Sequence, residues 1–398
     1  MTASAAAWAG PVGRANLAPI VRILLDYRPA LVTRTGVGEY VHRLAEALVK
    51  VSAGRDAITL FASSWKDRLA ADVIPGAAVA DVRLPARLLT SLWRRFQTPS
   101  IEQLAGAGPW DIVQSSQPTL VPSRTGIRLT TVYDLDFLNH PERTQAEFTG
   151  RYAALARRDA GTTDHVIAIS AYTAGEVEAR LGVPRNRITV CRPGRPAWTV
   201  RMAPPPASLA YLLFVGTLEP RKNVAGLLDA YARLVARNPQ APPLVLVGRT
   251  VAESAPVLAQ LDHHPFAGRV QHRGYIPDGE RAALYAGATA LILPSFFEGF
   301  GLPVLEAMTV GVPVIASDRG ALPEVLGDAG LLVSPDDPEE LAAAMHRVST
   351  EPRLAATLGA RGARRSLIFD WTSSATTLRE IYEALTAARR GRGGRAPA

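Results

Sequence analysis

Two carboxylates flank a glycine-rich turn between Ser295 and Glu306. Glu298 lies before the turn and Glu306 after it, and the glycines between them, Gly299 and Gly301, allow backbone conformations that a Cβ would forbid. Pro303 suits the first turn of a helix, so we expect a helix to begin here with free N–H groups that can hold a phosphate. The carboxylates would repel that phosphate, and we expect them to bind sugar hydroxyls instead.

A second cluster of charge follows the apolar run 212–215, which predicts a buried strand ending at Gly216. Arg221 and Lys222 come soon after it, at the carboxyl end where open α/β sheets bind ligands. The chain has 44 basic residues and only three of them are lysines, so a lysine here indicates that a compact ammonium group is needed. Lysine binds phosphate as a point charge.

Composition predicts a globular protein. The 398 residues are 47% hydrophobic and 20% charged, which favours two domains. The single cysteine, Cys191, excludes an internal disulfide, and no apolar run reaches the roughly 18 residues of a membrane span. Residues 1–18 lack the pattern of a signal peptide, so we expect a disordered leader on a cytoplasmic protein.

Strand and helix patterns alternate along the chain, which predicts an α/β fold with parallel sheets. The strands expected in the first half are 21–26, 57–62, 78–84, 111–114, 129–133, 165–169 and 188–191. Prolines and glycines at 193–206 predict a linker that acts as a hinge. We therefore divide the chain into domains 1–200 and 201–370, a returning helix 371–388 and a disordered basic tail 389–398.

From about residue 210 to 335 the chain resembles the family-4 retaining glycosyltransferases of the GT-B fold. Four strings carry the resemblance in order: G-T-L-E-P-R-K-N from Gly216, V-L-V-G-R ending at Arg249, G-Y-I-P-D from Gly274 and E-G-F-G-L-P-V-L-E from Glu298. The resemblance implies two Rossmann-like domains that face a central cleft, with a C-terminal helix that crosses back to the N-terminal domain.

The resemblance also implies a donor site for a nucleoside diphosphate sugar of the GDP or UDP type. Arg221 and Lys222 would neutralise the diphosphate, Glu298 would contact the sugar, and Glu306 would contact the ribose. The other donor-binding residues that it implies are Gly216, Thr217, Arg249, Tyr275, Ile276, Gly299, Phe300, Gly301 and Leu302.

In the first domain the resemblance implies an acceptor side. The loop of Gly36, Val37 and Gly38 would approach the donor phosphates or the acceptor, although it could equally be a tight turn. Ser170 would contact the acceptor, although a role as helix N-cap explains it fully.

Tyr133 stands where many relatives carry a histidine. A tyrosine can donate a hydrogen bond but has no proton switch near pH 7. Tyr133 and Asp134 are therefore our remaining catalytic candidates, with Asp134 orienting an acceptor hydroxyl or an arginine. In the alternative interpretation Tyr133 only packs in the wall of the cleft.

Basic charge is concentrated in the first half, which has 24 basic and 17 acidic residues. Residues 83–96 combine arginines with leucines, Trp93 and Phe96, a pattern typical of a helix on an anionic membrane. The alternative is a helix packed on its own domain. No nucleic-acid motif occurs, so we expect no nucleic-acid partner.

We therefore predict a retaining hexosyltransferase of polysaccharide biosynthesis that modifies a glycan, glycolipid or small-molecule acceptor. Mannose is favoured, because the E-P-R-K-N string is common among relatives that use GDP-mannose. We expect no cofactor and no metal, since no paired aspartates lie near the donor motifs. The alternative is a catalytically weak, nucleotide-sugar-binding scaffold subunit of a glycan-assembly complex, which the tyrosine at 133 favours and the intact donor motifs oppose.

Overall fold

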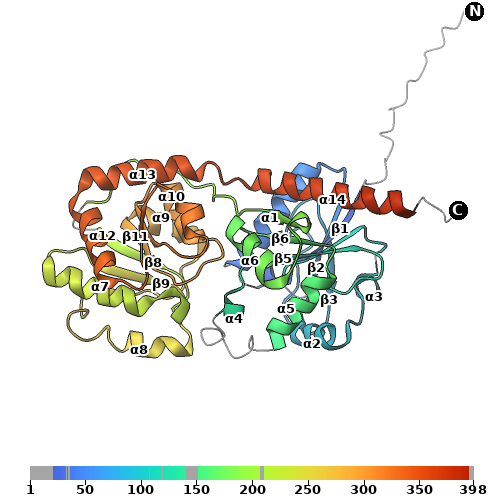
Figure 1. The fold of residues 1–398 in the computed structure, drawn as a ribbon, viewed down its shortest axis with the longest axis horizontal. Coiled ribbons are helices and arrows are strands. Elements are labelled where there is room, and N and C mark those ends of the chain that lie inside the picture. Colours follow the sequence, from blue (N-terminus) through green and yellow to red (C-terminus); the bar gives the residue numbers. More distant parts are fainter. Residues whose placement is uncertain are drawn as a thin grey trace, which may run out of the picture.

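Two α/β lobes lie side by side in the computed structural model (Figure 1). The structure describes residues 21–32, 34, 36–106, 108–117, 120–139, 151–206 and 210–393. The expected leader, 1–18, lies outside these residues. Every strand pairing in the described part is parallel, so the predicted pair of Rossmann-like lobes is confirmed.

The first lobe is built on a seven-stranded sheet in the order β3-β2-β1-β4-β5-β6-β7. Its elements are β1 (Arg22–Asp26), α1 (Val37–Ser52), β2 (Ala57–Ser63), β3 (Ala78–Val82), α2 (Ala86–Phe96), α3 (Ile101–Ala105), β4 (Ile112–Ser115), β5 (Ile127–Val132), α4 (Asp136–Asn139), α5 (Arg151–Thr162), β6 (His165–Ala168), α6 (Ala171–Leu181) and β7 (Ile188–Val190). Strand order reverses between β1 and β4, the position at which such sheets bind ligands.

The second lobe has a six-stranded sheet in the order β10-β9-β8-β11-β12-β13. Its elements are β8 (Tyr211–Val215), α7 (Val224–Arg237), β9 (Leu244–Val247), α8 (Ala255–Leu258), β10 (Val270–His272), α9 (Asp278–Ala286), β11 (Ala288–Leu293), α10 (Leu302–Val310), β12 (Val314–Ser317), α11 (Leu322–Leu326), β13 (Leu331–Val333), α12 (Pro338–Thr350) and α13 (Pro352–Ser366). Helices cover both faces, which explains why β8 is apolar along its whole length and β11 is apolar except at Thr289. Here the order reverses between β8 and β11.

Helix α14 (Trp371–Gly393) leaves the second lobe after α13 and runs along the first (Figure 1). The ring of Trp371 meets Tyr40 of α1 edge-on at 5.6 Å between centroids, and Arg379 pairs with the buried Asp56 at 2.8 Å. The predicted crossover helix is therefore confirmed. It continues to Gly393, past the expected end at 388, and Arg390 in this last part pairs with Asp111 at 3.4 Å. The start of the predicted tail is thus helical, and 394–398 lie outside the described residues.

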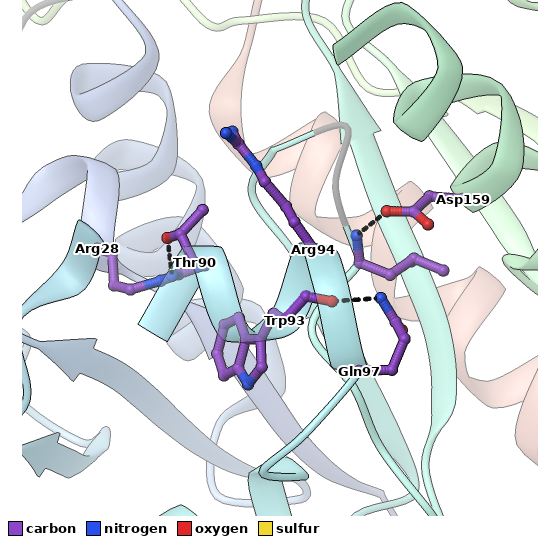
Figure 2. Close-up of a pocket in the computed structure, with 7 residues that line it drawn as sticks. Arg28, Thr90, Trp93, Arg94, Gln97 and Asp159 are labelled. Carbon is purple, nitrogen blue, oxygen red and sulfur yellow. Dashed lines mark hydrogen bonds between the residues drawn. The ribbon is translucent and has the colours of Figure 1, made fainter. Parts of the chain in front are cut away.

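Helix α2 occupies most of the segment 83–96. The Leu89 and Trp93 side chains of this helix are buried. The guanidinium of Arg28 lies 4.6 Å from the Trp93 ring, and Arg28 Nη1 donates to Thr90. Figure 2 shows Arg28, Thr90 and Trp93 among the side chains that line a small pocket here. One face of α2 is thus packed on its own lobe, as the alternative interpretation expected.

The other face of α2 is open to solvent. Leu88 is 52% exposed and Phe96 is 59% exposed, and Leu92, half-buried, lies between them at helical spacing of four residues. None of the helices in the described ranges is long and apolar enough to span a membrane.

Candidate active site

The charged residues of both sequence motifs meet at the carboxyl ends of β8 and β11. Arg221 and Lys222 lie in a 3-10 turn, Pro220–Lys222, that follows β8. Glu298 lies in the loop between β11 and α10. Because β8 and β11 are neighbours in the sheet, the fold brings together residues that are more than 70 positions apart in the chain.

Glu298 is the centre of this cluster. Its side chain is buried, and it accepts hydrogen bonds from Lys222 Nζ at 2.6 Å, Arg221 Nη1 at 3.3 Å and Ser295 Oγ at 2.8 Å. Burial alone would raise the pKa of Glu298, but Lys222 and Arg221 outweigh it and hold that pKa below its ordinary 4.5. The carboxylate is therefore ionised and shared by two cations.

Arg221 links this cluster to the other lobe. Its Nη1 donates to the carbonyl of Phe297 at 2.8 Å and its Nη2 to Glu219 at 2.7 Å. Burial would lower the pKa of Arg221, but the carboxylates of Glu298 and then Asp134 raise it above the ordinary value. Asp134 follows β5 of the first lobe, so acidic groups from both lobes act on one guanidinium.

Helix α10 begins directly after Gly301, as the sequence predicts. Gly301 has φ 101°, and a Cβ there would come within 2.6 Å of Leu322, so both its backbone conformation and its surroundings require glycine. Leu302 is the first helical residue. The helix N-terminus, with its partial positive charge, thus lies in the same loop as Glu298.

Two predicted donor residues in this segment are buried and have partners within the protein. The Phe300 side chain packs against Phe369, with ring centroids 5.6 Å apart, so it forms part of the core. Glu306 is also buried: Tyr285 donates to it at 2.6 Å, and Arg281 forms an ion pair with it. Both of its oxygens have protein partners that the sequence did not indicate.

The remaining predicted donor residues lie at the same edge of the second sheet. Gly216 directly follows β8, where a Cβ would lie 3.5 Å from the Lys222 stem, and the Thr217 carbonyl accepts from Glu219 N at 2.8 Å. The Arg249 guanidinium lies 5.4 Å from the ring of Tyr275, which is 44% exposed. Ile276 is half-buried against the core. Arg249 and Tyr275 thus form a cationic and aromatic surface beside the charged cluster.

Tyr133 packs in the cleft wall. Its ring meets Tyr40 edge-on at 5.5 Å, and its hydroxyl is buried with no hydrogen-bond partner among the residues that the structure describes. Burial, followed by the charge of Asp26, raises the pKa of Tyr133 well above its ordinary 10. The packing interpretation is therefore the better one for this side chain.

The acceptor-side candidates lie at the N-termini of two helices of the first lobe. Gly36 precedes α1 with φ 51°, and Val37 and Gly38 form the first turn of that helix. This geometry is compatible with the tight turn of the alternative interpretation, and the approach to phosphates or acceptor stays a prediction. Ser170 is fully buried and accepts from the amide of Thr173 at 3.0 Å. It is an N-cap, as the alternative interpretation expected, and the acceptor contact stays a prediction.

The two lobes touch at Gly299. A Cβ on this residue would stand 1.9 Å from the carbonyl oxygen of Tyr133, and the Thr173 hydroxyl lies 3.2 Å from the Gly299 carbonyl. The φ of Gly299 lies outside the left-handed region. Its need for glycine is thus steric, and the explanation from backbone conformation holds only for Gly301.

Comparisons with known proteins agree with this architecture. The family described as "Glycosyltransferase Family 4" matches residues 34–196, and "Glycosyl transferases group 1" matches residues 203–365. The chain belongs to the family-4 glycosyltransferases.

Individual relatives support the same assignment. This glycosyltransferase is 27% identical to the O-antigen chain mannosyltransferase B of Escherichia coli over 92% of its own length and 100% of the relative. Its fold is similar to sucrose-phosphate synthase from Thermosynechococcus elongatus, with TM-score 0.73, 22% identity and coverage of 92% and 100% of the two chains. It is also similar to Anabaena HepE in complex with UDP and glucose, with TM-score 0.68, 18% identity and the same coverage. The GT-B fold is thereby confirmed.

The sequence missed several residues of this transferase that shape the site. Ser295 and Glu219 bind the two ends of the charged cluster, and Thr173 bridges the lobes. Glu324 contacts the first lobe through the amide of Ala171. No signal in the local sequence identifies these partners, except that Glu219 belongs to the E-P-R-K-N string. In the described part of the chain, no cluster of three or more His, Cys, Asp or Glu side chains is arranged to hold a metal.

The contact at Gly299 predicts how the lobes respond to added bulk. In Gly299→Ala, the new Cβ would clash with Tyr133 at 1.9 Å, so the lobes must separate and misplace the site. We expect a larger radius of gyration in small-angle X-ray scattering and a rate about 100-fold lower. Gly279→Ala is the control, because a Cβ there meets nothing within 4 Å. An unchanged scattering profile for Gly299→Ala would contradict this role.

The charge on Glu298 predicts a pH dependence of stability. Because folding lowers the pKa of Glu298 below 4.5, its ionised form stabilises the fold above that pH and the contribution is lost as the pH falls through the lowered pKa. Glu298→Gln leaves the buried Lys222 without its anion and the half-buried Arg221 with Glu219 alone, and we expect it to lower the free energy of unfolding by about 3 kcal/mol at pH 7.

Calorimetry should therefore show a gap in Tm between the wild type and Glu298→Gln that shrinks between pH 5 and pH 2. Glu339→Gln, whose side chain is 48% exposed, is the matched control and should change Tm little at any pH. A gap that stays constant with pH would show that the charge of Glu298 is not what stabilises the site.

Proposed function

We propose that this enzyme transfers a hexosyl group from a nucleoside diphosphate sugar to an acceptor hydroxyl, with retention of configuration and without a metal. The observation that carries the proposal is the buried cluster of Arg221, Lys222 and Glu298 beside the N-terminus of α10. Both cations keep donors that Glu298 does not use, because an ammonium has three N–H bonds and a guanidinium has five. A diphosphate can therefore bind there while the carboxylate remains.

In the proposed reaction, negative charge develops next to this cluster. The bond between the sugar C1 and the β-phosphate oxygen breaks, and C1 forms a bond to the acceptor oxygen on the same face. The acceptor's proton moves to the departing phosphate oxygen, so no protein nucleophile takes part. Lys222, Arg221 and the helix amides stabilise the negative charge that develops on the diphosphate, an arrangement in which one lost donor typically costs about 10²- to 10³-fold in rate.

Mannose is the sugar we favour. The E-P-R-K-N string from Glu219 to Asn223 supports it, as does the full-length similarity to an O-antigen mannosyltransferase. The acceptor is then a growing glycan or glycolipid. Asp134, whose charge acts on Arg221 from the opposite lobe, is the residue we propose to orient the acceptor hydroxyl.

Nucleotide binding tests the donor site. In a thermal-shift panel of GDP, UDP, ADP and dTDP, we expect one diphosphate to stabilise the protein, by about 2.7 kcal/mol at 100 times its Kd. Lys222→Ala should abolish that shift because the buried ammonium is lost, whereas Lys66→Ala, at an exposed lysine of the other lobe, should retain it. Circular dichroism checks that both variants are folded.

The same experiment separates the proposal from the scaffold alternative. Transfer from the preferred diphosphate sugar is followed in EDTA, and the anomeric configuration of the product is read by NMR. Equal and weak binding of all four nucleotides would refute the donor site, and tight binding without turnover on any glycan acceptor would favour the scaffold.

We also propose that the exposed face of α2 rests on an anionic membrane, which would place the enzyme at the cytoplasmic surface where lipid-linked acceptors lie. Leu88, Phe96 and the 60% exposed Trp65 supply apolar contacts, and Arg83 and Arg95 stack on the two aromatic rings at 5.6 and 5.5 Å. Arginines around exposed aromatic rings suit the interface of an anionic bilayer.

Vesicle cosedimentation tests this contact. The protein should bind vesicles that contain 30% phosphatidylglycerol and not pure phosphatidylcholine, and high salt should weaken the binding because screening reduces the electrostatic attraction. Phe96→Ser should release it, whereas Leu367→Ser, at an equally exposed leucine of the other lobe, should not. Equal binding by both variants would rule out α2 as the contact surface.

A further inference from the structure

Glu324 of α11 reaches across the cleft to the first lobe. Its Oε1 accepts from the amide of Ala171 at 3.1 Å and its Oε2 from the amide of Tyr172 at 3.0 Å. Arg192, where the chain leaves the first lobe, donates to Oε1 at 2.9 Å. We propose that Glu324 is a positioning residue that couples closure of the lobes to the geometry of the donor site, an inference that rests on the proposed function.

The first lobe offers Glu324 a site that its own residues leave incomplete. Helix α6 begins at Ala171, and its cap, Ser170, serves only the amide of Thr173. The amides of Ala171 and Tyr172 have no partner within the helix. A carboxylate suits them because the helix N-terminus carries partial positive charge, and Arg192 adds a full charge on the same oxygen. The other lobe thus completes the cap.

Helix α11 transmits this contact to Glu298. At its start, Ala321 N donates to the Glu298 carbonyl at 2.9 Å, and Gly320 packs so closely that a Cβ would lie 2.5 Å from the same oxygen. Beyond Glu324, Arg365 donates to the carbonyls of Glu324 and Val325 at 2.8 and 2.7 Å. A single helical turn, fixed at both ends, therefore joins the α6 N-terminus to the backbone of the donor-site carboxylate.

Neighbouring contacts act on the same loop. The ring of Tyr172 meets Phe297 at 5.6 Å between centroids, and the Thr173 hydroxyl lies 3.2 Å from the carbonyl of Gly299. The residues on both sides of Glu298 are thus held by the first turn of α6. When Glu324 binds the first turn of α6, contacts from both lobes fix the position of the loop that carries Glu298. When Glu324 does not bind that turn, the contacts within the second lobe alone fix the loop.

This role predicts a particular kinetic pattern. The nucleotide-binding residues Arg221, Lys222 and Glu298 all belong to the second lobe, so Glu324→Ala should leave the Kd of the nucleoside diphosphate within about threefold while kcat falls ~10- to 100-fold, the scale of a misplaced reacting group. Glu324→Gln keeps the size of the side chain and one acceptor oxygen, so its kcat should lie between those of the wild type and Glu324→Ala. Arg192→Ala should reproduce part of the loss.

Hydrogen exchange supplies a readout in the opposite lobe. In the full-length enzyme with the diphosphate bound, the first-turn amides of α6 should be protected, and Glu324→Ala should accelerate their exchange at least about tenfold while the rest of α6 is unchanged. Asp328→Asn is the matched control near the end of α11, because the Asp328 side chain is 80% exposed, and it should change neither exchange nor kcat.

The outcomes are distinguishable from a failure of the proposed function. If Lys222→Ala keeps the nucleotide shift, the donor site is wrong. If Lys222→Ala loses it while Glu324→Ala and Glu324→Gln keep normal kcat, or keep protected α6 amides, only the role of Glu324 is overturned. A Kd that weakens as much as kcat falls would likewise overturn it, because Glu324 would then act on donor binding and not on closure.

Discussion

A buried carboxylate held between two cations is the constraint on which this site depends. Glu298 is ionised only because Lys222 and Arg221 neutralise it, and the cations are tolerated in a shielded position only because Glu298 is there. Each of these three charged groups is stable in this position only when the others are present. The sheet accordingly brings the end of β8 next to the end of β11, and the rest of the second lobe is arranged so that these two loops meet.

The second lobe alone does not complete the site. The charge of Asp134 acts on Arg221 from across the cleft, and Gly299 approaches the Tyr133 carbonyl so closely that no side chain fits between them. The lobes therefore share both an electrostatic contact and a steric one within a few residues of Glu298. This arrangement explains why the E-G-F-G string contains two glycines for different reasons, the first for a contact between lobes and the second for a backbone conformation.

The sequence predicted the local features, such as strands and the start of a helix, and did not predict contacts between residues far apart in the chain. Continuous apolar runs such as 212–215 were sufficient for the parallel strands, because such strands are buried on both faces, and Pro303 after Gly301 located the start of α10. The partners of Glu306 and Glu324 could not be predicted, since Arg281 and the amides of α6 come close only in the folded chain. The packing of Phe300 on Phe369 could not be predicted either, because a motif gives a residue's position but not the direction of its side chain.

The chain crosses between the lobes at two places that lie together. The outgoing linker and the returning segment before α14 are hydrogen-bonded to each other, Arg195 N to the Phe369 carbonyl at 2.9 Å, and Gly194 lies so close to Trp371 that a Cβ would stand 2.4 Å from its amide nitrogen. Two chain segments that are joined in this way resist torsion between the lobes more than a single segment would. A change in the angle between the lobes would therefore be a bend about this crossing rather than a twist, so the same surfaces of the two lobes would face each other at every angle.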